Sequence, residues 1–269
     1  MQNNLLKVFF ISDICGEPGR QSVKSLLPDL KIKENIDFVI ANCENATHGM
    51  GLNQRHYKEL KEAGIDLITL GNHAWEKEEI IPILKNQDII RPANFFSSNP
   101  GFGYSINDIY KNYKICVINL IGQVFMQPSN SPFEIAEQIL AEVIKESNII
   151  IIDFHAEATS EKLTMGYFLS GKVTAVVGTH THVQTSDERV LENHTGYITD
   201  AGMTGPVDSV LGMEKSVALK RFLTGRKEKY RISEEKDIEI QGVMLDVDPL
   251  TGRCLKIIRK KIKYTKKKA

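Results

Sequence analysis

The sequence predicts an α/β fold, and two features of the chain lead to this prediction. Apolar runs of strand length alternate with stretches that carry a helical pattern of apolar residues. The runs at 149–152 and 173–177 also lack the alternation of a half-exposed strand, which favours interior strands covered on both faces. With 269 residues and no low-complexity linker, we expect a single domain over 1–269.

The expected strands are distributed along the whole chain, at 7–12, 37–42, 66–70, 115–121, 149–154, 174–178, 196–199, 240–247 and 254–264. Lys7 interrupts the apolar N-terminal run and Asp13 ends it, so we interpret this run as a first strand rather than as a signal segment. Fewer helices separate the later strands than the early ones, which favours a mixed second sheet.

The expected helices carry recognisable end signals. Gly64 follows the pattern at 54–63 and Gly225 follows the one at 213–224, and glycine is favoured just past a helix C-terminus. Ser131 and Pro132 form an N-cap and first-turn pair for a further helix. Another helix starts at 159–162, where Lys162 or the backbone amides could hold a phosphate; a plain N-cap explains this segment equally well.

The composition excludes several classes of protein. A formal net charge of zero argues against a protein that coats nucleic acid, and no apolar run is long enough to span a membrane. The four cysteines form no CxxC pair, which favours reduced thiols over a disulfide framework or a zinc knuckle. We therefore expect a cytoplasmic protein without a membrane partner.

Positive charge is concentrated in a basic tail at about 256–269. The basic residues alternate there with Ile257, Ile258, Ile262 and Tyr264. We expect a final edge strand with a solvated basic face and a frayed end, in preference to a contact with RNA.

Short polar clusters follow five of the apolar runs, at the point where each run ends. α/β proteins place their chemistry at the carboxyl ends of the strands, so these clusters are expected to form one polar site. Each residue alone has a simpler explanation as a cap or a turn, but so many ligand-type side chains at strand ends favour a metal site. Two carboxylates, two amides and four imidazoles suit two metal ions and one additional acid or base: Asp13, Glu44, Asn45, Asn72, His73, His155, His180 and His182.

The order of these clusters resembles the calcineurin-like metallophosphoesterases. Cys15 stands where that superfamily has a histidine, and Glu44-Asn45 replaces its bridging aspartate segment. Both departures, over about residues 7 to 262, are similar to the YmdB-like bacterial cyclic-nucleotide phosphodiesterases. The motifs that carry this resemblance lie at 42–49, 71–75, 91–95, 153–162, 177–185 and 200–206.

The resemblance implies a fold and a ligand set. The fold would be a metallophosphoesterase-type sandwich of two mixed β-sheets flanked by helices. One metal would take Asp13, Glu44, Asn45 and His182, and the other would take Glu44, Asn72, His155 and His180. Glu44 would bridge the two ions, and His73 would remain free as the proton donor. Cys15 is interpreted as a packed small side chain rather than as a ligand.

The function that the resemblance implies is hydrolysis of 2′,3′-cyclic nucleotides by a hydroxide that bridges two metal ions, with weak action on 3′,5′-cyclic nucleotides left open. Iron or manganese is expected, and zinc also suits imidazole and carboxylate ligands. Two alternatives are a phosphomonoesterase or nucleotidase on the same site, and an RNA- or protein-binding regulator with little turnover. The complete ligand set argues against the regulator. Homo-oligomerisation is left open.

Overall fold

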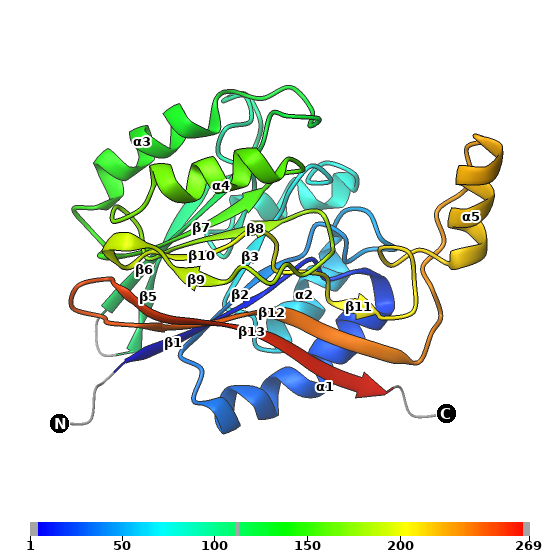
Figure 1. The fold of residues 1–269 in the computed structure, drawn as a ribbon, viewed down its shortest axis with the longest axis horizontal. Coiled ribbons are helices and arrows are strands. Elements are labelled where there is room, and N and C mark those ends of the chain that lie inside the picture. Colours follow the sequence, from blue (N-terminus) through cyan, green and yellow to red (C-terminus); the bar gives the residue numbers. More distant parts are fainter. Residues whose placement is uncertain (1–4, 111–112, 266–269) are drawn as a thin grey trace.

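The computed structural model describes residues 5–110 and 113–265. Two β-sheets pack face to face, and helices cover the outer face of each, which gives four layers (Figure 1). The sequence prediction of two mixed sheets flanked by helices is confirmed. Within the described residues, no helix is both long and apolar enough to cross a membrane.

The first sheet has seven strands in the order β11-β12-β1-β2-β3-β4, with β13 beside β12. Strands β1 to β4 are parallel, β12 runs antiparallel to β1, and β13 runs antiparallel to β12. The bounds are β1 (Leu6–Ile11), β2 (Phe38–Asn42), β3 (Leu67–Thr69), β4 (Ile89–Ile90), β11 (Gly205–Pro206), β12 (Asp237–Val247) and β13 (Cys254–Thr265).

The second sheet has six strands in the order β5-β6-β7-β8-β10-β9. Its four inner strands are parallel and its two edge strands are antiparallel to their neighbours. The bounds are β5 (Tyr104–Ile109), β6 (Tyr113–Ile121), β7 (Ile149–His155), β8 (Ala175–Thr179), β9 (Arg189–Val190) and β10 (Gly196–Ile198).

Five α-helices and three short 3-10 turns complete the described part of the chain. Helices α1 (Gly16–Glu34) and α2 (Gln54–Glu62) cover the first sheet, and α3 (Pro132–Val143) and α4 (Thr159–Phe168) cover the second. Helix α5 (Lys215–Thr224) stands away from the body of the protein in Figure 1. The 3-10 turns are η1 (Glu78–Ile80), η2 (Ile83–Lys85) and η4 (Glu192–His194).

Strand β7 shows why its sequence lacks alternation. Ile149 and Ile151 pack in the core between the two sheets, whereas Ile150 and Ile152 pack beneath α3 and α4. Successive side chains of a strand point to opposite faces, so a strand buried on both faces is apolar at every position. This strand delivers His155 to the edge of its sheet.

The basic segment at the end of the chain forms the edge strand that the sequence predicts. β13 pairs with β12 along its length, with Ile257 buried and Lys256, Lys261 and Lys263 exposed. The last part of the predicted basic tail, 266–269, lies outside the described residues.

Helix α4 is fixed to the ends of β8 and β10 by the buried contacts of Lys162, which include an ion pair. Lys162 and Asp200 are 1% and 0% exposed, and Lys162 Nζ donates to Asp200 Oδ2 at 2.7 Å and to the Thr179 carbonyl at 2.7 Å. Asp200 Oδ2 also accepts from the Thr181 backbone N–H at 3.0 Å. Lys162 therefore holds the loop after β8 in place, and the idea that its ammonium holds a substrate phosphate is wrong.

We predict that Lys162→Met lowers the free energy of unfolding by about 3–5 kcal/mol, because it leaves the Asp200 carboxylate buried without its cation. The control Lys114→Met removes an exposed ion pair with Glu146 and should cost at most about 1 kcal/mol. Urea denaturation of both variants measures the difference. Equal losses would show that the buried pair adds nothing beyond a surface contact.

Candidate metal centre

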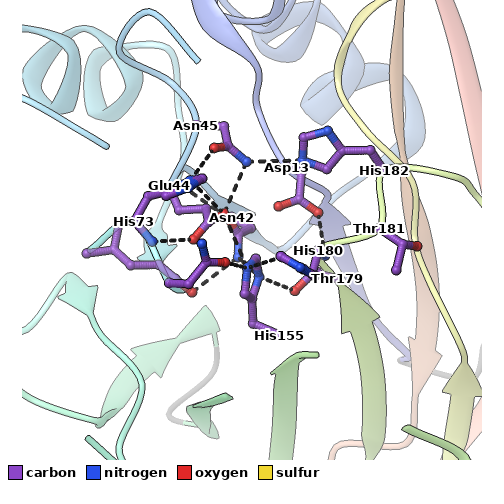
Figure 2. A network of polar contacts seen from close by, with 12 residues as sticks. Asp13, Asn42, Glu44, Asn45, His73, His155, Thr179, His180, Thr181 and His182 are labelled. Carbon is purple, nitrogen blue, oxygen red and sulfur yellow. Dashed lines mark hydrogen bonds and ion pairs between the residues drawn. The ribbon is translucent and has the colours of Figure 1, made fainter. Parts of the chain in front are cut away.

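The carboxyl ends of five strands from both sheets meet at one edge of the sandwich. Asp13 follows β1, Glu44 and Asn45 follow β2, and Asn72 and His73 follow β3 in the first sheet. His155 ends β7, and His180 and His182 follow β8 in the second. Figure 2 shows the labelled side chains of this set pointing toward one another, and Asn72 Oδ1 lies 2.9 Å from His155 Nε2, so the structure brings the predicted site residues together.

The orientation of His155 is fixed from behind by a buried chain of hydrogen bonds. The Thr179 hydroxyl donates its proton to Asp153 Oδ1 at 2.7 Å, so its oxygen is left to accept from His155 Nδ1 at 2.9 Å. Asp153 also accepts from Asn42 Nδ2, at 3.0 Å, and from the Thr69 hydroxyl. With Nδ1 occupied in this way, Nε2 is the ring atom that His155 presents to the site.

Three further ligand atoms converge on His155 Nε2. They are Asn72 Oδ1 at 2.9 Å, His180 Nδ1 at 3.0 Å and Glu44 Oε1 at 3.2 Å. Among the described His, Cys, Asp and Glu side chains, the ligand atoms of Glu44, His155 and His180 all lie within 4.8 Å of one another. Gly71 permits this approach, because a Cβ there would collide with Glu44 Oε2 and with the His155 ring.

The electrostatics of this group favour positive charge at its centre. Burial opposes a charged imidazole, but Glu44 and the nearby aspartates outweigh it and raise the pKa of His155 to about 9. Burial likewise opposes ionisation of Glu44, yet His155 and His73 hold the pKa of that carboxyl well below its usual range. A proton on His155 Nε2 can be shared among the three acceptor atoms around it. A divalent cation in place of that proton would face the same three atoms.

The other half of the predicted ligand set is more loosely arranged. Asp13 is fully buried, its Oδ2 accepts from the His180 backbone N–H at 3.1 Å, and its Oδ1 has no hydrogen-bond partner. A buried carboxylate oxygen without a partner is costly unless a cation or a donor reaches it. Asn45 Nδ2 lies 3.0 Å from His182 Nε2, while its oxygen turns toward His73. Of the predicted ligands, Asn45 alone would have to rotate its amide to offer oxygen.

His73 lies beside the carboxylate that both ligand sets share. Its Nδ1 is 2.8 Å from Asn45 Oδ1 and 3.3 Å from Glu44 Oε1, and its backbone N–H donates to Glu44 Oε2 at 2.9 Å. Burial lowers the pKa of His73, but Glu44 more than offsets this, so the pKa is raised. The imidazole is 23% exposed, which leaves it open to a substrate.

These residues fit a metal centre. The donor atoms are imidazole nitrogens and carboxylate and amide oxygens, which suit iron, manganese and zinc. The buried Asp13 oxygen without a hydrogen-bond partner and the ligand atoms that converge on His155 Nε2 both favour a bound cation. The Cys15 thiol contacts the Tyr230 hydroxyl at 3.9 Å and burial raises its pKa to about 12, which favours the expected packed side chain over a ligand.

Sequence reasoning missed the residues that hold the ligands in place. Asp153 and Thr179 support His155, and Asp200 anchors the loop after β8. Asp153 did carry a signal, since it is a carboxylate in an otherwise apolar strand. Two of its partners, Asn42 and Thr69, come from the opposite sheet, however, and the strand pattern alone does not reveal them.

The fold and most of the sequence match known proteins. A family model described as YmdB-like protein matches residues 9–260. The chain is 46% identical over 256 residues to the 2′,3′-cyclic-nucleotide 2′-phosphodiesterase of Bacillus subtilis (strain 168), a match that covers 94% of this chain and 96% of that protein. It is 37% identical over 261 residues to a putative phosphatase/phosphodiesterase of Mycoplasma pneumoniae, covering 94% and 92% of the two chains.

Two solved structures superpose closely on this one. A hypothetical protein from Thermus thermophilus gives a TM-score of 0.90 at 38% identity, covering 96% of this chain and 100% of that chain. A novel phosphatase from Mycoplasma pneumoniae gives a TM-score of 0.91 at 35% identity, covering 98% and 95%. From the family match, the sequence identities and the shared fold, we conclude that this chain belongs to the YmdB-like protein family, which is of the metallophosphoesterase type.

Proposed function

We propose that this protein is a metal-dependent phosphodiesterase that hydrolyses 2′,3′-cyclic nucleotides. The observation that carries the proposal is the convergence of Glu44, Asn72 and His180 on His155 Nε2, with His73 beside them. The substrate class comes from the relative that is named a 2′,3′-cyclic-nucleotide 2′-phosphodiesterase and is 46% identical to this chain.

The proposed centre holds two ions per chain, either iron or manganese, with zinc also suited to the donor set. Asp13, Glu44, Asn45 and His182 would hold one ion, and Glu44, Asn72, His155 and His180 the other. When bound, such ions supply an activated water and offset the negative charge of the phosphate. Two divalent ions bring about four positive charges against two anionic ligands, so an anionic phosphodiester is favoured beside them.

His73 is the proposed proton donor. Glu44 raises its pKa, which favours the protonated imidazole, and the contact of Nδ1 with Glu44 Oε1 leaves the other ring nitrogen to face a substrate. Opening a 2′,3′-cyclic phosphate at the 2′ bond expels a ribose oxygen. This oxygen leaves readily only if it gains a proton as the bond breaks.

We also propose that the protein works in the cytoplasm. All four cysteines are unpaired and buried, which is the state that a reducing compartment maintains. The proposed partner is a small nucleotide.

The function is tested by incubating the purified protein with 2′,3′-cyclic AMP, 3′,5′-cyclic AMP and 3′-AMP, with and without EDTA. We expect 3′-AMP to accumulate from the 2′,3′-cyclic substrate and EDTA to abolish the reaction. Release of inorganic phosphate from 3′-AMP at a comparable rate would instead identify a phosphomonoesterase. No turnover of any substrate by metal-loaded protein would favour the regulator.

Glu44 should matter more to metal binding than any ligand that serves one ion. A carboxylate shared by two coordination spheres contributes to both, so Glu44→Gln should lower the occupancy of both metals. Asn45→Ala should mainly lower one. Metal counts per chain by mass spectrometry distinguish the two, and full double occupancy in Glu44→Gln would discard the bridging role.

His73→Ala should affect substrates according to their leaving groups. General acid catalysis is typically worth about 10²–10⁴-fold, and we expect a loss in that range for kcat on a 2′,3′-cyclic nucleotide. Nitrophenolate leaves without a proton, so bis-p-nitrophenyl phosphate should show a much smaller loss at unchanged metal content. Equal losses on both substrates would mean that His73 positions the phosphate instead of donating a proton.

A further inference from the structure

Glu157 contacts a proposed metal ligand and has no role in the chemistry described above. It lies between the end of β7 and the start of α4, and its Oε2 is 3.1 Å from His180 Nε2. The other ring nitrogen of His180 points inward, 3.0 Å from His155 Nε2. Glu157 therefore lies behind His180, on the side away from the metal centre.

Each of the three imidazoles in the proposed ligand set is held at its outer nitrogen. His155 Nδ1 contacts the Thr179 hydroxyl at 2.9 Å, and His182 Nδ1 lies 3.3 Å from the Leu211 carbonyl. His180 is the one whose outer nitrogen meets a carboxylate directly. A carboxylate behind a ligating histidine fixes the proton on the far nitrogen and makes the near nitrogen more basic.

This contact favours one of the two positions for the proton of His180. A neutral imidazole has a single N–H, and a histidine that binds a metal through one ring nitrogen carries its proton on the other. A carboxylate only accepts, so Glu157 favours the proton on Nε2 and leaves Nδ1 as a lone pair. Without Glu157, this tautomer would rest on the proton at His155 Nε2 alone, and a share of the His180 rings would carry their proton on Nδ1, where it blocks the ligand atom.

Because Glu157 is exposed, its effect on the His180 ring can be told apart from a role in core packing. Its side chain is 48% exposed, so its removal leaves no cavity in a core. His180 itself has an uncommon backbone, with φ of 100°, and its N–H is held by Asp13 Oδ2. The contact with Asp13 fixes the position of the His180 main chain, and the contact with Glu157 fixes the position of the outer ring nitrogen, Nε2.

We propose that Glu157 is a positioning residue that holds His180 in the Nε2–H form, so that Nδ1 is offered to the metal. This inference rests on the proposed function to the extent that His180 is taken as a metal ligand. It predicts an effect on one of the two binding steps, since His180 belongs to one ligand set.

The test compares Glu157→Ala and Glu157→Gln with the wild-type chain. A control variant, Glu137→Ala, removes a carboxylate on α3 that is 59% exposed. The first readout is the 15N NMR spectrum of the histidines in metal-free protein, with the His180 signals identified from His180→Asn. The second is the titration of each protein with Mn²⁺ alone, followed by calorimetry.

In Glu157→Ala we expect the His180 signals to shift away from the pure Nε2–H pattern and one Mn²⁺ dissociation constant to rise about 10–100-fold. Glu157→Gln retains an acceptor oxygen and should restore most of the Nε2–H pattern and most of the Mn²⁺ affinity. Glu137→Ala should match the wild type in both measurements. An unchanged tautomer and affinity in Glu157→Ala would overturn this proposal alone. Failure of the wild type to bind Mn²⁺ would overturn this proposal together with the assignment of manganese to the proposed centre.

Discussion

The contact between Glu44 and His155 joins the two sheets at the edge where the site lies. Glu44 follows β2 in the first sheet and His155 ends β7 in the second, and their Oε1 and Nε2 atoms are 3.2 Å apart. A hydrogen bond from Asn42 to Asp153 crosses the same junction. The centre exists only because the sheets pack with their carboxyl ends aligned, so the whole sandwich, including its inter-sheet core, acts as the scaffold of the site.

The polar groups at this junction are held at a cost. Asp13, Glu44 and Asp153 are all buried, and burial is the largest influence on the pKa of each, raising that of Asp153 to about 6. Buried carboxylates of this kind are tolerated where hydrogen bonds and opposite charge offset the lost hydration. The hydroxyl bonds to Asp153 and the imidazoles around Glu44 have this role. The buried Oδ1 atom of Asp13 has no hydrogen-bond partner, so its desolvation remains unfavourable until a cation reaches it.

The strands and the candidate site residues could be predicted from the sequence because both follow from local patterns. Apolar runs form the strands, and the side chain that follows each run lies at the sheet edge. Helix α1 could not be predicted in this way: its first turn contains Gly16, Pro18 and Gly19, which is typical of a loop, and Pro28 lies inside it. The structure supplies the reason for Gly19, since a Cβ there would collide with the Thr204 carbonyl. The packing of Val23 and Leu27 on the sheet, rather than local propensity, stabilises the helix.

The assignment of each ligand to a metal rests on the resemblance and stays a prediction, because the side chains alone fit more than one division between two ions.

The register of β1 has a consequence for when the centre can form during synthesis. The strand that precedes Asp13 pairs on one side with β2 and on the other with β12, where Leu6 lies opposite Val247. Leu6 and Val247 are therefore neighbours although they are far apart in the sequence, and β1 lacks this partner until β12 has left the ribosome. His155, His180 and His182 also emerge long after Asp13 and Glu44. An early fragment thus has part of the ligand set but not the sheet that aligns it, so we expect the complete centre to assemble only once the chain has been made through β12.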